Sequence, residues 1–217
     1  MRPLSPLEAR VLGVLIEKQA TVPDTYPLSL NALVSGCNQK TARQPVIEAT
    51  EGDVLVALEG LKSLSLVFEG SGSRVVKFEH NTARVLHLPG AAVALMAVLM
   101  LRGPQTSAEL RLNAERLHRF ADISSVEGFL DELANKPEPF AIKLARAAGE
   151  REARWAQLLC GEVAQPARRA SADEPGARFD VAAGELAAIK AEQNRLAAEV
   201  ADLRALVQRM AGELGIS

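Results

Sequence analysis

The sequence has few aromatic residues, only two cysteines and no excess of charge of one sign. Aromatic residues make up 4% of the 217 residues and hydrophobic residues 48%, so the core must consist mainly of Leu, Val and Ala, which favours helices. Cys37 and Cys160 lie far apart, without a CxxC spacing or a nearby histidine pair, so neither a disulfide framework nor a zinc site is indicated. With 25 basic and 27 acidic residues, any basic surface for nucleic acid must be local.

The sequence also lacks long apolar runs and the usual motifs of enzymes. Its longest apolar run, residues 91–101, is too short to span a bilayer, and the N-terminus does not resemble a signal peptide. The histidines are widely separated, and no phosphate-binding loop or nucleophile motif occurs. We therefore predict a cytoplasmic protein that is not an enzyme, with no metal, no cofactor and no membrane partner.

Residues 50–78 carry the clearest structural pattern in the chain. Thr50 and Asp53 can form a capping box at the start of a helix. Apolar residues then follow at helical spacing, at Val54, Leu55, Leu58 and Leu61. Residues 66–68 and 75–78 are rich in β-branched and aromatic residues and flank a Gly-Ser segment, which predicts a hairpin. A helix that leads into a hairpin is typical of the second half of a winged-helix domain.

The residues before this stretch supply the first two helices of such a domain. Ser5, Pro6 and Glu8 predict a helix start, and the helix should continue to about Gln19, with Glu8 and Arg10 mostly off its apolar face. Ser29 should cap a short second helix over residues 30–37, and Pro45 makes residues 38–49 irregular. Residues 1–80 are therefore predicted to form one winged-helix domain.

The same order of elements begins again at Leu88, after a short connector over residues 81–87. Thr106 with Glu109, and Ser124 with Glu127, predict the starts of a second and a third helix. Residues 140–145 and 153–159 indicate a second hairpin. We predict a second winged-helix domain over residues 88–163, docked on the first, since the connector is too short and apolar for a flexible spacer. The leucines expected in the two cores are Leu12, Leu33, Leu58, Leu99, Leu110 and Leu130.

The last part of the chain has a different composition. Residues 164–181 are polar and rich in Pro and Arg, which indicates a flexible linker. Apolar residues in residues 182–214 then alternate at intervals of four and three, the a/d pattern of a coiled coil and hence of a homodimer. The alternative is a lone amphipathic helix folded back on the body. The predicted dimerisation residues are Leu186, Ile189, Gln193, Leu196, Val200, Leu203, Val207 and Met210.

The whole pattern predicts a mainly α protein with small β-hairpin wings: two tandem winged-helix domains followed by a C-terminal coiled-coil helix. DNA binding, as in a transcription regulator, is the leading functional hypothesis, because this fold presents its third helix and wing to duplex DNA. The third helices are acidic, however, so the alternative is a protein–protein interaction or assembly module with a protein partner. The predicted DNA-binding residues are Lys40, Arg43, Arg74, Lys77, Arg111, Arg116, Arg119, Arg146, Arg151 and Arg154.

Six segments between residue 4 and about residue 163 form a recognisable set. They are residues 4–12 (LSPLEARVL), 26–33 (YPLSLNAL), 37–40 (CNQK), 72–77 (GSRVVK), 101–106 (LRGPQT) and 151–154 (REAR). Together these segments resemble the bacterial YceH family. The resemblance implies a tandem winged-helix fold, similar in architecture to transcription regulators, and it brings no catalytic residues to this chain.

Overall fold

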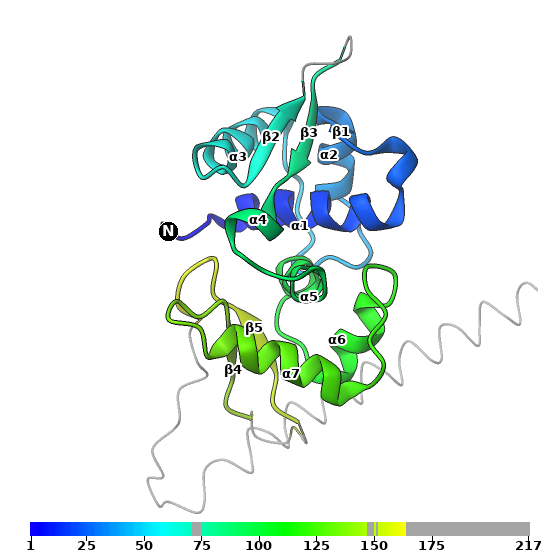
Figure 1. Ribbon diagram of the computed structural model, residues 1–217. Coiled ribbons are helices and arrows are strands. Elements are labelled where there is room, and N and C mark those ends of the chain that lie inside the picture. Colours follow the sequence, from blue (N-terminus) through cyan, green and yellow to red (C-terminus); the bar gives the residue numbers. More distant parts are fainter. Residues whose placement is uncertain (71–74, 147–149, 151, 164–217) are drawn as a thin grey trace, which may run out of the picture. The chain divides into compact units, whose positions relative to one another are not determined.

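A computed structural model describes residues 1–70, 75–146, 150 and 152–163 of the chain (Figure 1). These residues belong to one compact unit, Met1–Arg168. Arg74, Arg151, the predicted linker over 164–181 and the predicted coiled-coil helix over 182–214 lie outside the described residues.

The described part of the chain is mainly helical, with small antiparallel sheets, as the sequence predicts. The first set of elements consists of α1 (Pro6–Thr21), a 3-10 turn η1 (Pro23–Thr25), β1 (Leu28–Ser29), α2 (Leu30–Cys37), α3 (Glu51–Ser63), β2 (Val67–Gly70) and β3 (Lys77–His80). The second set follows the short helix α4 (Thr82–Val85) and consists of α5 (Gly90–Arg102), α6 (Ser107–Ala114), α7 (Ile123–Ala134), β4 (Ala141–Lys143) and β5 (Trp155–Gln157).

Local capping chemistry sets most of the helix starts. Ser5, Thr50 and Thr106 each accept a hydrogen bond from the backbone three residues on, and an acidic side chain returns one, so all three predicted capping boxes are confirmed. The cap of α7 is a correction: Asp122, not Ser124, precedes the helix, and its carboxylate accepts from the backbone N–H of Ser125 at 2.7 Å. A carboxylate two residues earlier can cap as well as a serine, so α7 begins before the predicted position.

The strands are displaced from their predicted positions by their pairing. In the first sheet the order is β1-β3-β2, and Leu28 opposite Phe78 fixes the start of β3 at Lys77. The predicted strand residues Val75 and Val76 therefore precede β3 and are exposed. In the second set β4 pairs only with β5, but Gln105 forms an isolated bridge with Trp155 just before α6. The second hairpin is shorter than predicted.

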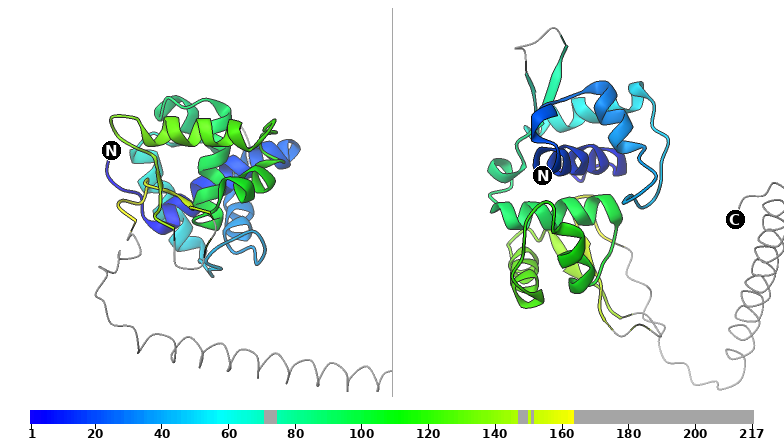
Figure 2. Two further views of the ribbon diagram at one scale, coloured as in Figure 1. Left: turned by 90° about the horizontal axis from the view of Figure 1, so that it is seen from below. Right: turned by 90° about the vertical axis from the view of Figure 1, so that its right-hand side faces the viewer.

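Helices α1 and α5 make the most extensive contact between elements of the described chain, and they cross where they meet (Figures 1 and 2). Gly13 permits the close approach, because a Cβ placed there would lie 2.9 Å from Leu101 Cγ of α5. The result is one continuous hydrophobic core that includes residues from both sets of elements. All six leucines expected in the cores are buried: Leu12, Leu33, Leu58, Leu99, Leu110 and Leu130.

Two predicted helix faces differ from the observed ones. Glu8 and Arg10 were expected off the apolar face of α1, but both are buried, because α2, α3 and α5 surround this helix. Glu8 is held by Arg2 at 2.6 Å, next to Gly60 of α3. Leu55 was expected in the core, but it is 43% exposed because Val54, Ala57, Leu58 and Leu61 form the buried face of α3.

Candidate functional site

Helix α3 presents a long exposed face on the first set of elements. Its N-terminus is fixed by the Thr50–Asp53 capping box, and its inner face packs on α1 and α2. Leu55 and Val56 are 43% and 75% exposed, so two large apolar side chains face solvent. The remaining exposed residues of α3 are Glu51, Gly52, Asp53, Glu59 and Ser63.

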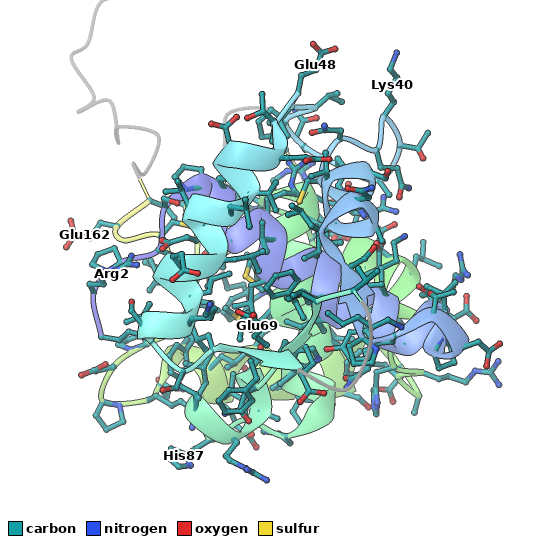
Figure 3. The ribbon with its side chains drawn as sticks, turned by 90° about the horizontal axis from the view of Figure 1, so that it is seen from above. Arg2, Lys40, Glu48, Glu69, His87 and Glu162 are labelled. Atoms are coloured by element: carbon teal, nitrogen blue, oxygen red, sulfur yellow. The ribbon has the colours of Figure 1, made fainter. Side chains whose placement is uncertain are left out.

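A groove of about 680 Å³ runs between α3, the start of α2 and strands β2 and β3. Its walls are mostly apolar, with carboxylates of Glu59 and Glu69 and the amine of Lys77 among them. Figure 3 labels Glu69, whose position on β2 borders α3. The residues that line the groove are Ser29, Leu30, Asn31, Leu55, Leu58, Glu59, Glu69, Val75, Val76, Lys77 and Phe78. An apolar groove with charged groups at its sides is suited to a protein segment.

The one basic residue of α3 is already paired. Lys62 Nζ lies 2.8 Å from Glu59 Oε1 and 2.8 Å from Glu69 Oε2. The hydrogen bonds to Glu59 and then to Glu69 raise the pKa of Lys62 above its ordinary value. These bonds connect α3 to β2, and they leave little free positive charge on α3 for a phosphate.

Arg43, predicted to contact DNA, is buried instead. Its guanidinium donates to Glu17 Oε2 at 2.6 Å and to the carbonyl of Gly36 at 3.0 Å, and its side chain has 0% exposure. Burial raises the pKa of Glu17, but the hydrogen bond and charge of Arg43 outweigh it, so the pKa lies below its ordinary value. In the folded protein Arg43 is a structural residue that anchors the irregular segment before α3.

The other predicted contacts on the first set are only partly brought together. Lys40 is exposed in the loop after α2 and extends away from the body (Figure 3). Lys77 is half-buried at the groove. Arg74 lies outside the described residues. Of the residues predicted to bind DNA on the first set, Lys40 and Lys77 are therefore the ones that the structure shows to be at least partly exposed.

The second set places its basic residues around the end of α6 and the second hairpin. Arg116, Arg119 and Arg146 are exposed, whereas Arg111 is half-buried and donates to the carbonyl of Ala121 at 3.2 Å. Arg154 pairs with Glu109 at 2.9 Å and Glu150 at 3.1 Å. The exposed residues of α7 itself are Ile123, Ser124, Gly128, Asp131 and Glu132, so this helix, like α3, exposes no basic side chain among its described residues.

The residues that the structure describes contain no group of three or more His, Cys, Asp or Glu side chains that could hold a metal ion. None of the helices within the described ranges is long and apolar enough to cross a membrane. Cys37 is buried, and burial raises the pKa of its thiol to about 11, so it is a poor nucleophile.

Fold and site together define a mainly helical protein with small antiparallel sheets and an exposed, acidic and apolar third helix. The chain belongs to the YceH-like UPF0502 family: residues 4–150 match the family described as "Protein of unknown function, DUF480". A UPF0502 protein of Burkholderia cenocepacia is 64% identical over 216 residues, which cover 100% of this chain and 91% of the relative. UPF0502 proteins of Leptothrix cholodnii (63% identical, 100% of this chain and 97% of the relative) and Cupriavidus necator (62%, 100% and 89%) are similar.

Proposed function

We propose that this chain is a tandem winged-helix protein that acts without catalysis by docking another protein on the groove between α3 and the first wing. Two observations support the tandem arrangement. Three helices followed by two antiparallel strands occur twice in the chain. In both sets the residues just before the second helix also pair with the last strand, Leu28 with Phe78 and Gln105 with Trp155.

The observation that carries the proposed function is the chemistry of the exposed face of α3. A winged helix that reads DNA needs unpaired Lys or Arg on its third helix and wing, since phosphate neutralisation supplies most of the affinity. Here that face offers Leu55, Val56 and carboxylates. Across the described residues of α3, β2 and β3 there are five carboxylates and two lysines.

The expected occupant of the groove is an amphipathic segment of a partner protein with apolar and basic side chains. Its apolar side chains would cover Leu55, Val75 and Val76, which are exposed here. Each 100 Å² of apolar surface removed from water stabilises the complex by about 2.5 kcal/mol before the cost of association. Basic side chains of the partner would meet the carboxylates, which would speed association and select against acidic partners.

Retention on duplex DNA is the experiment that tests this proposal. The purified full chain should pass a column of immobilised duplex at low salt without delay. Retention that falls steeply as salt rises would overturn the proposal, because that dependence is the signature of phosphate contacts.

A photo-crosslinking residue at Leu55, which lines the groove and is 43% exposed, tests the docking surface directly. In cells of a related bacterium it should give one dominant, identifiable adduct, whereas the same residue at Glu132 on the exposed face of α7 should not. The identified partner, once purified, should bind at least tenfold more weakly to Glu59→Lys than to the matched control Glu132→Lys. Equal binding to both variants would contradict the assignment of the groove.

DNA binding, the leading hypothesis from the sequence, is the second candidate here, because Lys40, Arg116 and Arg119 are exposed near the second helices. If duplex DNA is bound, replacing Arg74 and Lys77 should weaken binding to all sequences. The slope of the logarithm of the binding constant against the logarithm of the salt concentration should also fall by about one for each phosphate that is no longer neutralised. Replacing Glu51 and Asp53 by Gln and Asn should strengthen binding by removing repulsion. No detectable binding at low salt in either form would leave protein docking as the function.

A further inference from the structure

A second cavity, of about 480 Å³, lies where the two sets of elements meet. Its walls come from α1, the irregular segment before α3, α5 and the residues after β5. The volume lies within the range of about 300–1,000 Å³ found for small-molecule sites. Most of the wall is apolar and includes Leu7, Ile47, Leu99 and Met100. This cavity is separate from the groove on α3, and the proposed docking does not use it.

One wall of the cavity carries a buried guanidinium. Arg10 is 3% exposed, and it donates to the carbonyls of Cys37 at 3.0 Å and Pro45 at 2.6 Å. Its Nε has no hydrogen-bond partner among the described residues. Arginine has five N–H donors, so the two carbonyls leave the guanidinium with donors to spare.

The charge of Arg10 is not balanced by a nearby carboxylate. Within the described part of the chain it forms no salt bridge, whereas its neighbour Arg43 uses Glu17. Burial, and then the charge of Arg43, lower the pKa of Arg10. Of these two buried guanidinium groups, only that of Arg43 has a carboxylate partner among the described residues, and a buried charge without a counter-ion is unfavourable.

The carboxylates near the cavity do not fill this role. Glu48 and Asp53 line the cavity but are exposed, and Glu48 extends away from the body (Figure 3). Asp53 is committed to the cap of α3, where its carboxylate accepts from the backbone N–H and hydroxyl of Thr50 at 2.9 and 2.6 Å. Among the described residues, the guanidinium of Arg10 therefore has no carboxylate partner.

From this geometry we propose that the cavity binds a small organic acid with an apolar body. Its carboxylate pairs with the guanidinium of Arg10, and its hydrocarbon part packs on Ile47, Leu99 and Met100. An arginine is suited to a carboxylate because its planar fork can donate two parallel bonds. The ligand would contact both sets of elements at once and so stabilise their packing.

Calorimetric titration of the full chain tests the proposal, with straight-chain acids from hexanoate to decanoate and 4-phenylbutyrate as probes. At least one acid should bind, and its primary amide, which keeps the shape and loses the charge, should bind at least tenfold more weakly. Equal affinity of acid and amide would overturn the proposal, and so would the failure of every acid to bind.

Variants locate the site. Arg10→Gln should abolish binding of the acid, and circular dichroism should show whether this variant folds. Ile47→Trp, which fills the cavity without touching the buried charge, keeps the test valid if Arg10→Gln unfolds, and it should also abolish binding. The matched control is Val46→Trp, at a neighbouring residue that is 51% exposed and does not line the cavity. Undiminished binding to folded Ile47→Trp would place the acid elsewhere and contradict the assignment.

Discussion

Glu17 of α1 and Arg43 of the irregular segment before α3 form a two-point ion pair, Nη1 to Oε1 at 3.2 Å and Nη2 to Oε2 at 2.6 Å. The pair ties residues 26 apart in the chain, and the guanidinium has 0% exposure. Three further bonds from Arg43 reach the carbonyls of Gly36 and Ala42 and the side chain of Gln39. Arg43 therefore holds the segment that leads into α3.

Removing this arginine should destabilise the protein strongly. In Arg43→Met the half-buried carboxylate of Glu17 keeps Lys18, at 3.2 Å, but loses its two-point partner, so the free energy of unfolding in urea should fall by about 1.5–3 kcal/mol. Lys40→Met, an exposed position in the same loop, should change it by less than about 0.5 kcal/mol. An Arg43→Met protein as stable as the Lys40→Met control would contradict this structural role.

The contact between α1 and α5 can be tested by adding one methyl group. In Gly13→Ala the new Cβ would lie 2.9 Å from Leu101 Cγ, so overpacking should cost about 1–3 kcal/mol despite the better helix propensity of alanine. Gly128→Ala is the matched control on α7, where nothing lies within 4 Å of the new Cβ, and it should stabilise by up to about 1 kcal/mol. Equal thermal shifts for the two variants would show that α1 and α5 do not approach so closely.

His80 should make the protein less stable in mild acid. Burial lowers its pKa to about 4, and its ring is neutral, accepting at Nδ1 from the N–H of Thr82 at 3.4 Å and meeting Gln19 Oε1 through Nε2 at 2.8 Å. Because the folded pKa lies below the unfolded value, this contribution to stability is complete above pH 6.5 and is lost as the pH falls toward about 4. The loss is at most about 3 kcal/mol.

The measurement is the free energy of unfolding between pH 7.5 and pH 4 for the wild type and His80→Gln. The variant should lose less stability across this interval, because glutamine does not titrate. The carboxyl groups of the protein titrate equally in both proteins and do not affect the comparison. Parallel curves for the two proteins would show that the His80 ring titrates normally in the folded state.

The predicted coiled coil over residues 182–214 determines the expected oligomer. The predicted g and e positions pair Glu185 with Lys190 and Glu199 with Arg204 only in a parallel dimer, which gives the tail its expected orientation. Light scattering at micromolar concentration should therefore show a dimer for the full chain and a monomer after removal of residues 177–217. A monomeric full chain, or a dimer that survives the truncation, would refute the assignment.

Local chemistry explains which parts of the fold could be predicted. Capping boxes depend on residues three apart, so Ser5, Thr50 and Thr106 could be recognised without knowledge of the tertiary structure. The predicted cap of α7 was wrong because Asp122 and Ser124 both offer a capping oxygen to that turn, and only the neighbouring packing selects between them. The predicted ends of the strands were wrong for a similar reason, since the pairing of β1 with β3 depends on residues far apart in sequence.

The candidate sites were less predictable, because they depend on partners that are distant in the chain. No local pattern distinguishes Arg43, which is buried against Glu17, from Lys40, which is exposed three residues earlier. The sequence predicts Arg10 on the polar side of α1. This prediction is wrong because the spacing of apolar residues in one helix does not reveal that several elements pack around it. The acidic character of α3 was visible in the sequence, but the exposure of Leu55 and Val56 was not.

The backbone N–H of Leu4 donates to the carbonyl of Leu159 at 2.7 Å, and Gly161 lies against Pro3. The labelled residues Arg2 and Glu162 accordingly lie on the same side in Figure 3. Residues 3–4 and residues 159–161, close to the two ends of the described chain, are therefore neighbours, so the path of the chain between them is nearly a closed ring. A short peptide could join these ends and new termini could be opened elsewhere, for instance in the exposed loop at Lys40.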